Sequence, residues 1–150
     1  MALAWPLAMA FRAAYIGLGD ASMAEDMREI LIADDNAALR HSLKAVLEAA
    51  GYRVRLARDG AEALALQSER PADILITDIF MPEADGFETI DSFRKAFPAT
   101  KIIAMSGEAK RVKSEYLSAA ALLGVDATLK KPFEREALLH AVRSLTGADH

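Results

Sequence analysis

Short apolar runs rich in β-branched residues alternate along the chain with segments whose apolar residues recur at helical spacing. The runs predict five strands, at residues 29–33, 52–57, 73–77, 101–105 and 125–129. Four apolar stripes predict helices between and after them, and a further helix, closed by Gly124, is predicted ahead of the fifth strand. The stripes are Leu39, Leu43, Val46, Leu47 and Ala50; Ala61, Leu64 and Ala65; Phe87, Ile90, Phe93 and Phe97; and Leu138, Leu139, Val142 and Leu145.

Helix-breaking residues separate these elements. Gly51, Pro71 and Pro98 follow the first three helical stripes and end them. Strands that alternate with helices in this way are typical of an α/β fold with a doubly wound parallel sheet. No repeat or low-complexity linker interrupts residues 28–147, so they form a single predicted domain, and residues 148–150 form a short tail.

Residues 1–27 form an apolar extension ahead of the first strand. Their apolar stripe predicts an additional helix that packs on other apolar surface. No Lys or Arg precedes the apolar part and Arg12 interrupts it, so the segment is expected to be neither a secretion signal nor a membrane span. An alternative of equal weight is that translation starts at Met23 or Met27. The stripe consists of Leu3, Leu7, Phe11, Ala14, Tyr15 and Leu18.

Composition limits the classes of partner. The 150 residues carry 18 Lys and Arg against 22 Asp and Glu, and this net charge of −4 argues against nucleic-acid binding, which usually needs a concentrated basic face. A protein partner is expected instead. The chain has no cysteine, which is compatible with a cytoplasmic location and leaves oxygen atoms as the ligands for any metal.

Polar and charged side chains follow four of the predicted strands. Asp34 and Asp35 come after the first strand, Asp78 after the third, Ser106 after the fourth, and Lys131 two residues after the fifth. The carboxyl ends of parallel strands share one edge of a sheet, so these side chains are expected to lie together. Three neighbouring carboxylates repel one another unless a cation lies among them. Magnesium suits such a cluster, because it prefers oxygen ligands and keeps several waters.

This set of residues strongly resembles the receiver domain of bacterial two-component response regulators. The segment from Asp78 to Gly86, DIFMPEADG, is similar to that family's phosphoacceptor segment, and the segment from Lys131 to Phe133, KPF, matches the family as well. The resemblance covers most of the chain. It implies a flavodoxin-like or CheY-like five-stranded sheet in the order 2-1-3-4-5, with five helices in the domain.

The resemblance also implies a phosphorylation site with a bound divalent ion. Asp78 matches the phosphoacceptor, and a carboxylate can indeed attack phosphorus to give an acyl phosphate. Asp35, Asp78 and the backbone carbonyl of Phe80 match the direct ligands of Mg²⁺ or Mn²⁺. Asp34 matches a residue that holds the ion mainly through water.

Four further residues match positions that the family uses. Ser106 corresponds to the hydroxyl that donates to a phosphate, and Lys131 to the ammonium that reaches the phosphate or, before phosphorylation, the carboxylate of Asp78. In the family the peptide bond before the residue that matches Pro132 is usually cis, which would direct Lys131 into the site. Gly86 corresponds to a structural glycine.

Three features depart from the usual family pattern. Thr128 stands where many receivers carry an aromatic switch residue, so we expect Ser106 to be coupled to the output differently. The segment from Gly107 to Glu115 is longer than is typical, which indicates a particular partner rather than a generic one. Phe80 and Glu108 occupy positions at which the family tunes the approach of hydrolytic water.

The implied role is signalling, with self-catalysed phosphotransfer rather than enzymatic turnover. The expected phosphodonor is a histidine kinase or a histidine phosphotransfer protein, and the expected output is phosphorylation-dependent binding of a downstream protein or relay of the phosphoryl group. Only a few residues follow the last helix, which predicts a stand-alone receiver without a DNA-binding domain. Two copies could pair through the face of the fourth helix, fifth strand and last helix, or through the N-terminal helix.

Two other classes of function use similar residues. One is a receiver fold that binds its partner without phosphate, against which the intact Asp34, Asp35, Ser106 and Lys131 weigh. The other is a haloacid-dehalogenase-like phosphatase. Such an enzyme needs a second acid two residues after its nucleophile as general acid, and this chain has Phe80 there.

Individual residues also have plainer interpretations. Asp34 and Asp78 could cap the helices that follow their strands. Ser106 and Lys131 could be ordinary turn and surface residues, although the whole set favours the phosphorylation site. The plainer interpretation is preferred for the scattered histidines, which lack metal-ligand spacing and are expected in solvent. They are His41, His140 and His150.

We expect the substitution Phe80→Asn to shorten the lifetime of the acyl phosphate, because a bulky apolar side chain at this position hinders the hydrolytic water. The decay of the phosphorylated species, followed by intact mass after removal of the phosphodonor, measures that lifetime. An unchanged lifetime would rule out this role for Phe80.

Overall fold

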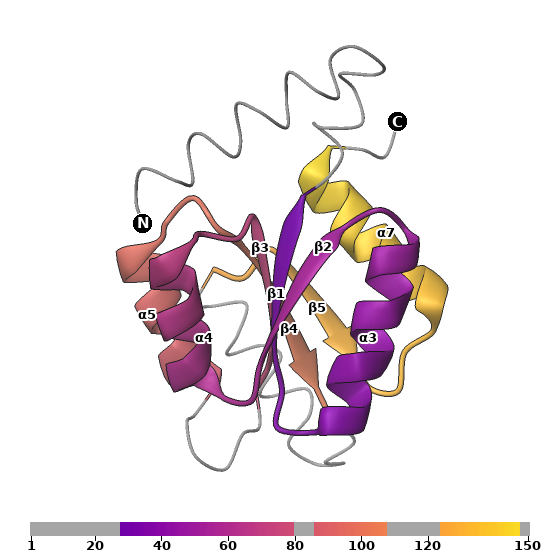
Figure 1. Ribbon diagram of the computed structural model, residues 1–150, viewed down its shortest axis with the longest axis horizontal. Coiled ribbons are helices and arrows are strands. Elements are labelled where there is room, and N and C mark those ends of the chain that lie inside the picture. The colour runs from indigo at the N-terminus through magenta and orange to yellow at the C-terminus, as the bar shows by residue number, and fades with distance from the viewer. Residues whose placement is uncertain (1–27, 80–85, 108–123, 148–150) are drawn as a thin grey trace.

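A computed structural model describes residues 28–79, 86–107 and 124–147. Its centre is a five-stranded sheet in the order β2-β1-β3-β4-β5, in which every pairing is parallel (Figure 1). The α/β fold class and the strand order are therefore confirmed. The strands are β1 (Glu29–Ala33), β2 (Arg53–Ala57), β3 (Ile74–Asp78), β4 (Lys101–Ser106) and β5 (Ala127–Lys130).

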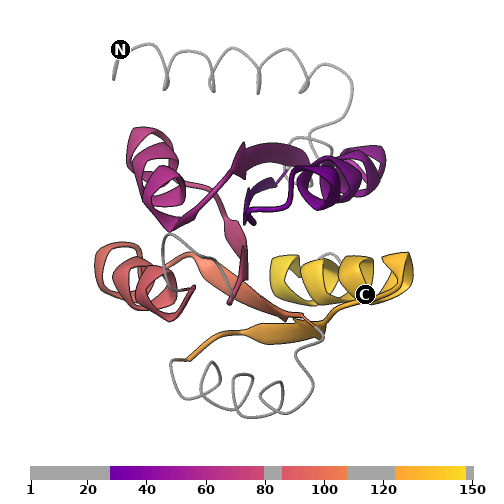
Figure 2. The same cartoon turned by 90° about the horizontal axis from the view of Figure 1, so that it is seen from below.

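Four helices cover the two faces of the sheet within the described residues. Figure 2 shows α3 and α7 on one face and α4 and α5 on the other. None of these helices is long and apolar enough to cross a membrane. The predicted N-terminal helix and the predicted fourth helix lie outside the described residues. The helices are α3 (Ala37–Ala49), α4 (Gly60–Glu69), α5 (Gly86–Ala96) and α7 (Arg135–Thr146).

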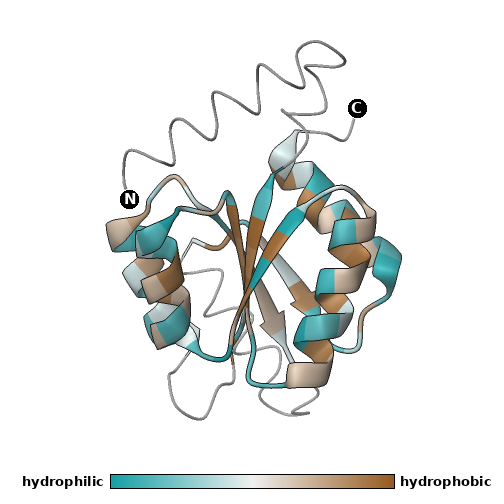
Figure 3. Ribbon diagram, viewed as in Figure 1, coloured by the Kyte–Doolittle hydropathy of each residue, from teal (hydrophilic) through white to brown (hydrophobic). Residues whose placement is uncertain are grey.

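The core has two parts, one on each face of the sheet. Every residue of β1 and β3 is buried, as expected for central parallel strands with helices on both sides. Successive residues of β1 alternate between the two parts: Ile30 packs with α3 and α7, and Leu31 packs with α4 and α5. Figure 3 shows the corresponding apolar strands and the apolar inner sides of the helices.

The predicted aromatic core residues lie on the α5 side. Phe93 is fully buried, while Phe87 and Phe97 are partly buried and pack against the same part of the core. The rings of Phe93 and Phe97 lie 5.6 Å apart between centroids. Phe97 follows the last residue of α5, so it extends the packing beyond the helix itself.

The fifth strand begins two residues later than predicted. β5 starts at Ala127, which pairs with Ile103, whereas the apolar pattern placed its start at Val125. The side chain of Asp126 explains the difference, because its Oδ2 accepts a hydrogen bond from the backbone N–H of Ile102 at 2.8 Å. A side-chain oxygen thus takes the place of a backbone acceptor in the ladder.

The predicted inward face of α4 is wrong in part. Ala61 and Ala65 are exposed, whereas Ala63 and Gln67 are fully buried. Apolar residues lie on several sides of this short helix, so spacing did not define one face. The buried amide of Gln67 is satisfied, because its Oε1 accepts from the Ala72 N–H at 2.9 Å and its Nε2 donates to the Thr100 hydroxyl at 2.9 Å.

Substitutions in α4 test this assignment. We expect Ala63→Glu to lower the free energy of unfolding by about 4 kcal/mol or more, because it forces an unpaired charge into the core. The matched substitution Ala65→Glu, on the exposed side of the same helix, should change it by less than about 0.5 kcal/mol. Urea unfolding of both variants measures the difference, and equal effects would contradict the observed helix face.

Candidate functional site

The site lies at the edge of the sheet where the strands end. Asp34 directly follows β1, Asp78 ends β3, Ser106 ends β4, and Lys131 directly follows β5. The strand register aligns these ends, because Ala33 pairs with Thr77 in the central pair of strands. The position between β1 and β3, where the chain changes direction across the sheet, is where open α/β sheets bind their ligands.

Three carboxylates meet at this edge. Asp34, Asp35 and Asp78 each offer an oxygen atom, and these atoms all lie within 4.8 Å of one another. Asp34 is fully buried and Asp78 is 5% exposed, while Asp35 is open to solvent. Burial removes the water that would otherwise screen the repulsion between Asp34 and Asp78, so this acidic pocket depends on nearby positive charge.

Lys131 supplies a positive charge to the acidic pocket. Its Nζ lies 2.7 Å from Asp34 Oδ2 and 3.4 Å from Asp78 Oδ2. The peptide bond between Lys131 and Pro132 is cis, the geometry that the family resemblance implied. The two distances show that the ammonium bridges two carboxylates. Its shorter contact is with Asp34, a partner that the sequence reasoning missed.

The loop after β1 is held by a set of local hydrogen bonds. The backbone N–H of Asn36 donates to Asp34 Oδ1 at 2.8 Å, and Arg40 Nη1 donates to the backbone carbonyl of Asp34 at 2.7 Å. Asn36 in turn caps α3, because its side chain accepts from the Leu39 N–H at 3.0 Å. The plainer interpretation of Asp34 as the helix cap is therefore wrong.

Asn36 and Arg40 are the site residues that sequence reasoning missed. An asparagine just before a helical stripe is a common N-cap signal, so Asn36 could have been found. Arg40 carried no comparable signal, since its contact with Asp34 depends on the path of the loop.

Ser106 lies at the same edge as the acidic pocket. It is fully buried, and its hydroxyl donates to the backbone carbonyl of Gly107 at 3.2 Å. Its own carbonyl accepts from the Lys131 N–H at 2.7 Å, which joins the ends of β4 and β5. The backbone of Ser106 thus helps to hold Lys131.

A second charged cluster, at the opposite edge of the sheet, contains charges of both signs. The buried carboxylate of Glu29 contacts Arg70 Nη2 at 2.6 Å and Arg55 Nε at 3.3 Å. Burial lowers the pKa of Arg55, and Glu29 partly opposes this shift. One carboxylate faces two guanidinium groups there, so this cluster has no excess of negative charge for a cation to neutralise. The acidic pocket has three carboxylates and one lysine among the described residues.

A family comparison agrees with this geometry. The family model described as the response regulator receiver domain matches residues 30–143. This chain belongs to the response regulator receiver family. The match runs from the second residue of β1 through β5 and into α7, so it includes each residue of the acidic pocket and Lys131.

Individual relatives resemble the receiver to different extents. The response regulator MprA of Mycobacterium sp. strain KMS is 37% identical over 119 residues, which are 77% of this chain and 49% of that protein. MprA of Mycobacterium avium strain 104 is 39% identical over 120 residues, covering 77% of this chain and 50% of that protein. The chain spans about half the length of these curated relatives.

Solved structures share the fold of the receiver. The CheY-like receiver domain protein of Methanospirillum hungatei JF-1 has a TM-score of 0.73 at 30% identity, over 81% of this chain and 95% of that one. Chemotaxis protein CheY4 of Vibrio cholerae has a TM-score of 0.70 at 32% identity, over 79% of this chain and 98% of that one.

Of the three residues at which this receiver departs from the usual family pattern, the structure describes one. Thr128 is exposed on β5 and pairs with Ala104 of β4. Phe80 and Glu108 lie outside the described residues, as does the segment after Gly107 up to residue 123. The expected roles of Phe80, Glu108 and Thr128 stay predictions.

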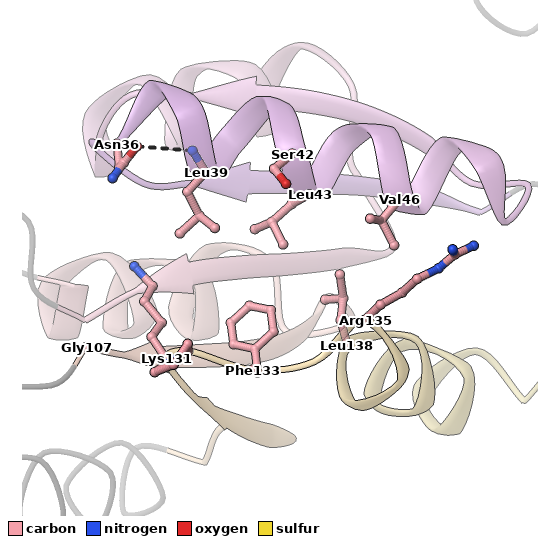
Figure 4. Close-up of a pocket in the computed structure, with 11 residues that line it drawn as sticks. Asn36, Leu39, Ser42, Leu43, Val46, Gly107, Lys131, Phe133, Arg135 and Leu138 are labelled. Carbon is pink, nitrogen blue, oxygen red and sulfur yellow. Dashed lines mark hydrogen bonds between the residues drawn. The ribbon is translucent and has the colours of Figure 1, made fainter.

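An apolar groove lies beside the acidic pocket of the receiver. It has a volume of about 760 Å³ and runs between α3 and α7 (Figure 4). Leu39, Val46 and Phe133 contribute apolar walls, and Asn36 and Lys131 form the end next to the pocket. A molecule in this groove would therefore contact residues that hold the acidic pocket in place.

Gly86, the first residue of α5, packs directly against the end of β3. Its N–H donates to the carbonyl of Ile79 at 3.1 Å. A Cβ atom at this position would lie 2.5 Å from Ile79 Cα, 2.6 Å from Ile79 O, and also against the backbone carbonyl of Asp78. The backbone cannot move aside without moving Asp78, so only glycine allows this close approach.

We expect Gly86→Ala to lower the free energy of unfolding by about 2 kcal/mol, because the added methyl group meets backbone rather than a flexible side chain. It should also displace Asp78. Gly107→Ala is the matched control, since a Cβ there has no atom within 4 Å. Chemical denaturation of the two variants measures the difference, and a Gly86→Ala protein as stable as the control would contradict the close packing.

Proposed function

We propose that this receiver accepts a phosphoryl group on Asp78, with a magnesium ion bound in the acidic pocket. The observation that carries the proposal is the convergence of Asp34, Asp35 and Asp78 within 4.8 Å, beside a lysine that contacts two of them. Asp78 is 5% exposed at the end of β3, so its carboxylate is largely shielded from bulk water.

The donor set of the acidic pocket fits a magnesium ion. Three carboxylates and one ammonium leave a formal charge of −2, which a divalent cation would balance. All available ligand atoms are oxygen, which Mg²⁺ and Mn²⁺ accept. Asp35 and Asp78 would hold the ion directly and Asp34 through water, with the backbone carbonyl of Phe80 as the further ligand that the family resemblance implies.

The residues of the receiver then perform the transfer. A carboxylate oxygen of Asp78 attacks the phosphorus of a phosphohistidine, the new O–P bond forms as the N–P bond breaks, and the imidazole of the donor takes up a proton. The bound ion, when present, neutralises charge on the phosphoryl oxygens. In-line positioning of Asp78 is the main contribution of the fold.

Two other side chains respond to the new phosphoryl group. Lys131 exchanges its contact with Asp34 for one with a phosphoryl oxygen, since its flexible ammonium already lies between Asp34 and Asp78. The hydroxyl of Ser106 leaves the Gly107 carbonyl and donates to another phosphoryl oxygen. These exchanges alter the ends of β4 and β5, where the signal begins.

The partners of the receiver follow from this chemistry. The donor is a histidine kinase or a histidine phosphotransfer protein, and the output is the binding of a downstream protein or the relay of the phosphoryl group. The cytoplasmic location, the absence of nucleic-acid contact and the homodimer contacts stay predictions. The stand-alone arrangement also stays a prediction, because the MprA relatives are about twice as long as this chain.

Intact mass after incubation with acetyl phosphate tests the proposal. We expect one phosphoryl adduct in the presence of magnesium, and its loss when EDTA removes the ion. The adduct should be absent in Asp78→Asn, which keeps the size of the side chain but lacks the nucleophilic carboxylate. Asp91→Asn is the matched control, because the side chain of Asp91 is 50% exposed on α5 and pairs with Lys95.

Two outcomes would contradict the proposal. An adduct that persists in Asp78→Asn would assign the phosphoryl group to another residue. No adduct in the unmodified protein, if a histidine kinase also fails to phosphorylate it, would favour the binding module that works without phosphate.

A further inference from the structure

Arg40 reaches back from α3 to the loop that carries two of the three carboxylates. Its Nη1 donates to the backbone carbonyl of Asp34 at 2.7 Å, and its own backbone N–H donates to the carbonyl of Asn36 at 3.0 Å. The first bond joins a half-buried guanidinium to a residue that is fully buried. Arg40 therefore ties the start of α3 to the end of β1.

The contact with Arg40 completes the anchoring of Asp34. The backbone N–H of Asp34 donates to Ala57 O at 3.2 Å, its Oδ1 accepts from the Asn36 N–H, and its Oδ2 contacts Lys131. Without the guanidinium of Arg40, the buried backbone carbonyl of Asp34 would lose this hydrogen-bond donor. A buried acceptor without a donor destabilises the fold. The loop would then shift to find another donor, and Asp35, the next residue, would shift with it.

A positive charge so close to a cation site has two opposite effects. Repulsion between the guanidinium and a bound divalent ion weakens binding, whereas fixing the loop strengthens it. Arg40 is half-buried, so water screens part of its charge, while the hydrogen bond acts at contact distance. Outer-shell hydrogen bonds that orient metal ligands typically change metal affinity by about 10–100-fold.

We propose that Arg40 is a positioning residue for the cation site, which acts by holding the Asp34–Asn36 loop so that Asp34 and Asp35 face Asp78. This inference rests on the proposed function, because it concerns the affinity of the acidic pocket for its ion. Arg40 acts through the loop and touches neither the phosphoryl group nor the ion.

Titration calorimetry with magnesium alone, without a phosphodonor, tests the role of Arg40. Arg40→Met removes both the charge and the hydrogen bond, and we expect it to weaken magnesium binding roughly tenfold. Arg40→Lys keeps the charge and one donor of similar reach and should restore most of the affinity. Arg58→Met removes an arginine that is 74% exposed just after β2, at the same edge of the sheet, and should leave the affinity unchanged.

A second set of measurements distinguishes a loss of magnesium affinity from a loss of phosphorylation rate and from a loss of stability. The magnesium concentration that gives half-maximal phosphorylation by acetyl phosphate should rise in Arg40→Met, while the maximal rate at saturating magnesium stays close to that of the unmodified protein. Thermal unfolding in EDTA reports the stability of each variant without the ion.

Several results would overturn the inference. Tighter magnesium binding in Arg40→Met would mean that repulsion dominates, and unchanged binding with a lower Tm in EDTA would mean that the contact is only structural. Either result can be interpreted only if the unmodified protein binds magnesium. If the unmodified protein binds none, the proposed cation site itself fails, and this outcome is distinct from a failure confined to Arg40.

Discussion

The repulsion between carboxylates at the end of the central strands is the constraint on which this structure depends. Asp34 and Asp78 are both buried, and each contacts the same ammonium, that of Lys131. One positive charge does not balance three negative charges, so the charge of this pocket favours binding of a cation. A fold that had only to be stable would gain from apolar residues at these positions.

The sheet makes this costly arrangement tolerable. β1 and β3 are buried on both faces by α3 and α7 on one side and α4 and α5 on the other, and this apolar burial fixes the strand ends from which the carboxylates project. Close packing reaches the site itself, because Gly86 of α5 lies against the backbone of Asp78 and Ile79. The backbone around Asp78 therefore has little room to move independently of the elements packed against it.

The same edge also offers routes by which a change at Asp78 can reach the surface. Lys131 contacts the acidic pocket and forms one end of the groove between α3 and α7, while the backbone of Ser106 is bonded to that of Lys131. Thr128 is exposed and its side chain is short, so an aromatic switch at this position has no counterpart in this receiver. If Asp78 is phosphorylated as proposed, the ends of β4 and β5 are the first elements that a change at Lys131 and Ser106 would reach.

The sequence by itself determined the strand-helix alternation, the buried central strands and the types of residue at the strand ends, because these depend on local patterns of apolar residues and on which residues follow each strand. It did not determine the inward face of α4, where alanines on several sides left Ala63 and Gln67 unassigned, or the start of β5, where the side chain of Asp126 bonds to β4.

Only the tertiary structure decided two contacts of the site: the pairing of Lys131 with Asp34, and the hydrogen bond from Arg40 to the Asp34 carbonyl. Lys131 and Asp34 are 97 residues apart in the chain, and Arg40 meets its partner through the path of a loop, so no sequence period or spacing encodes either contact.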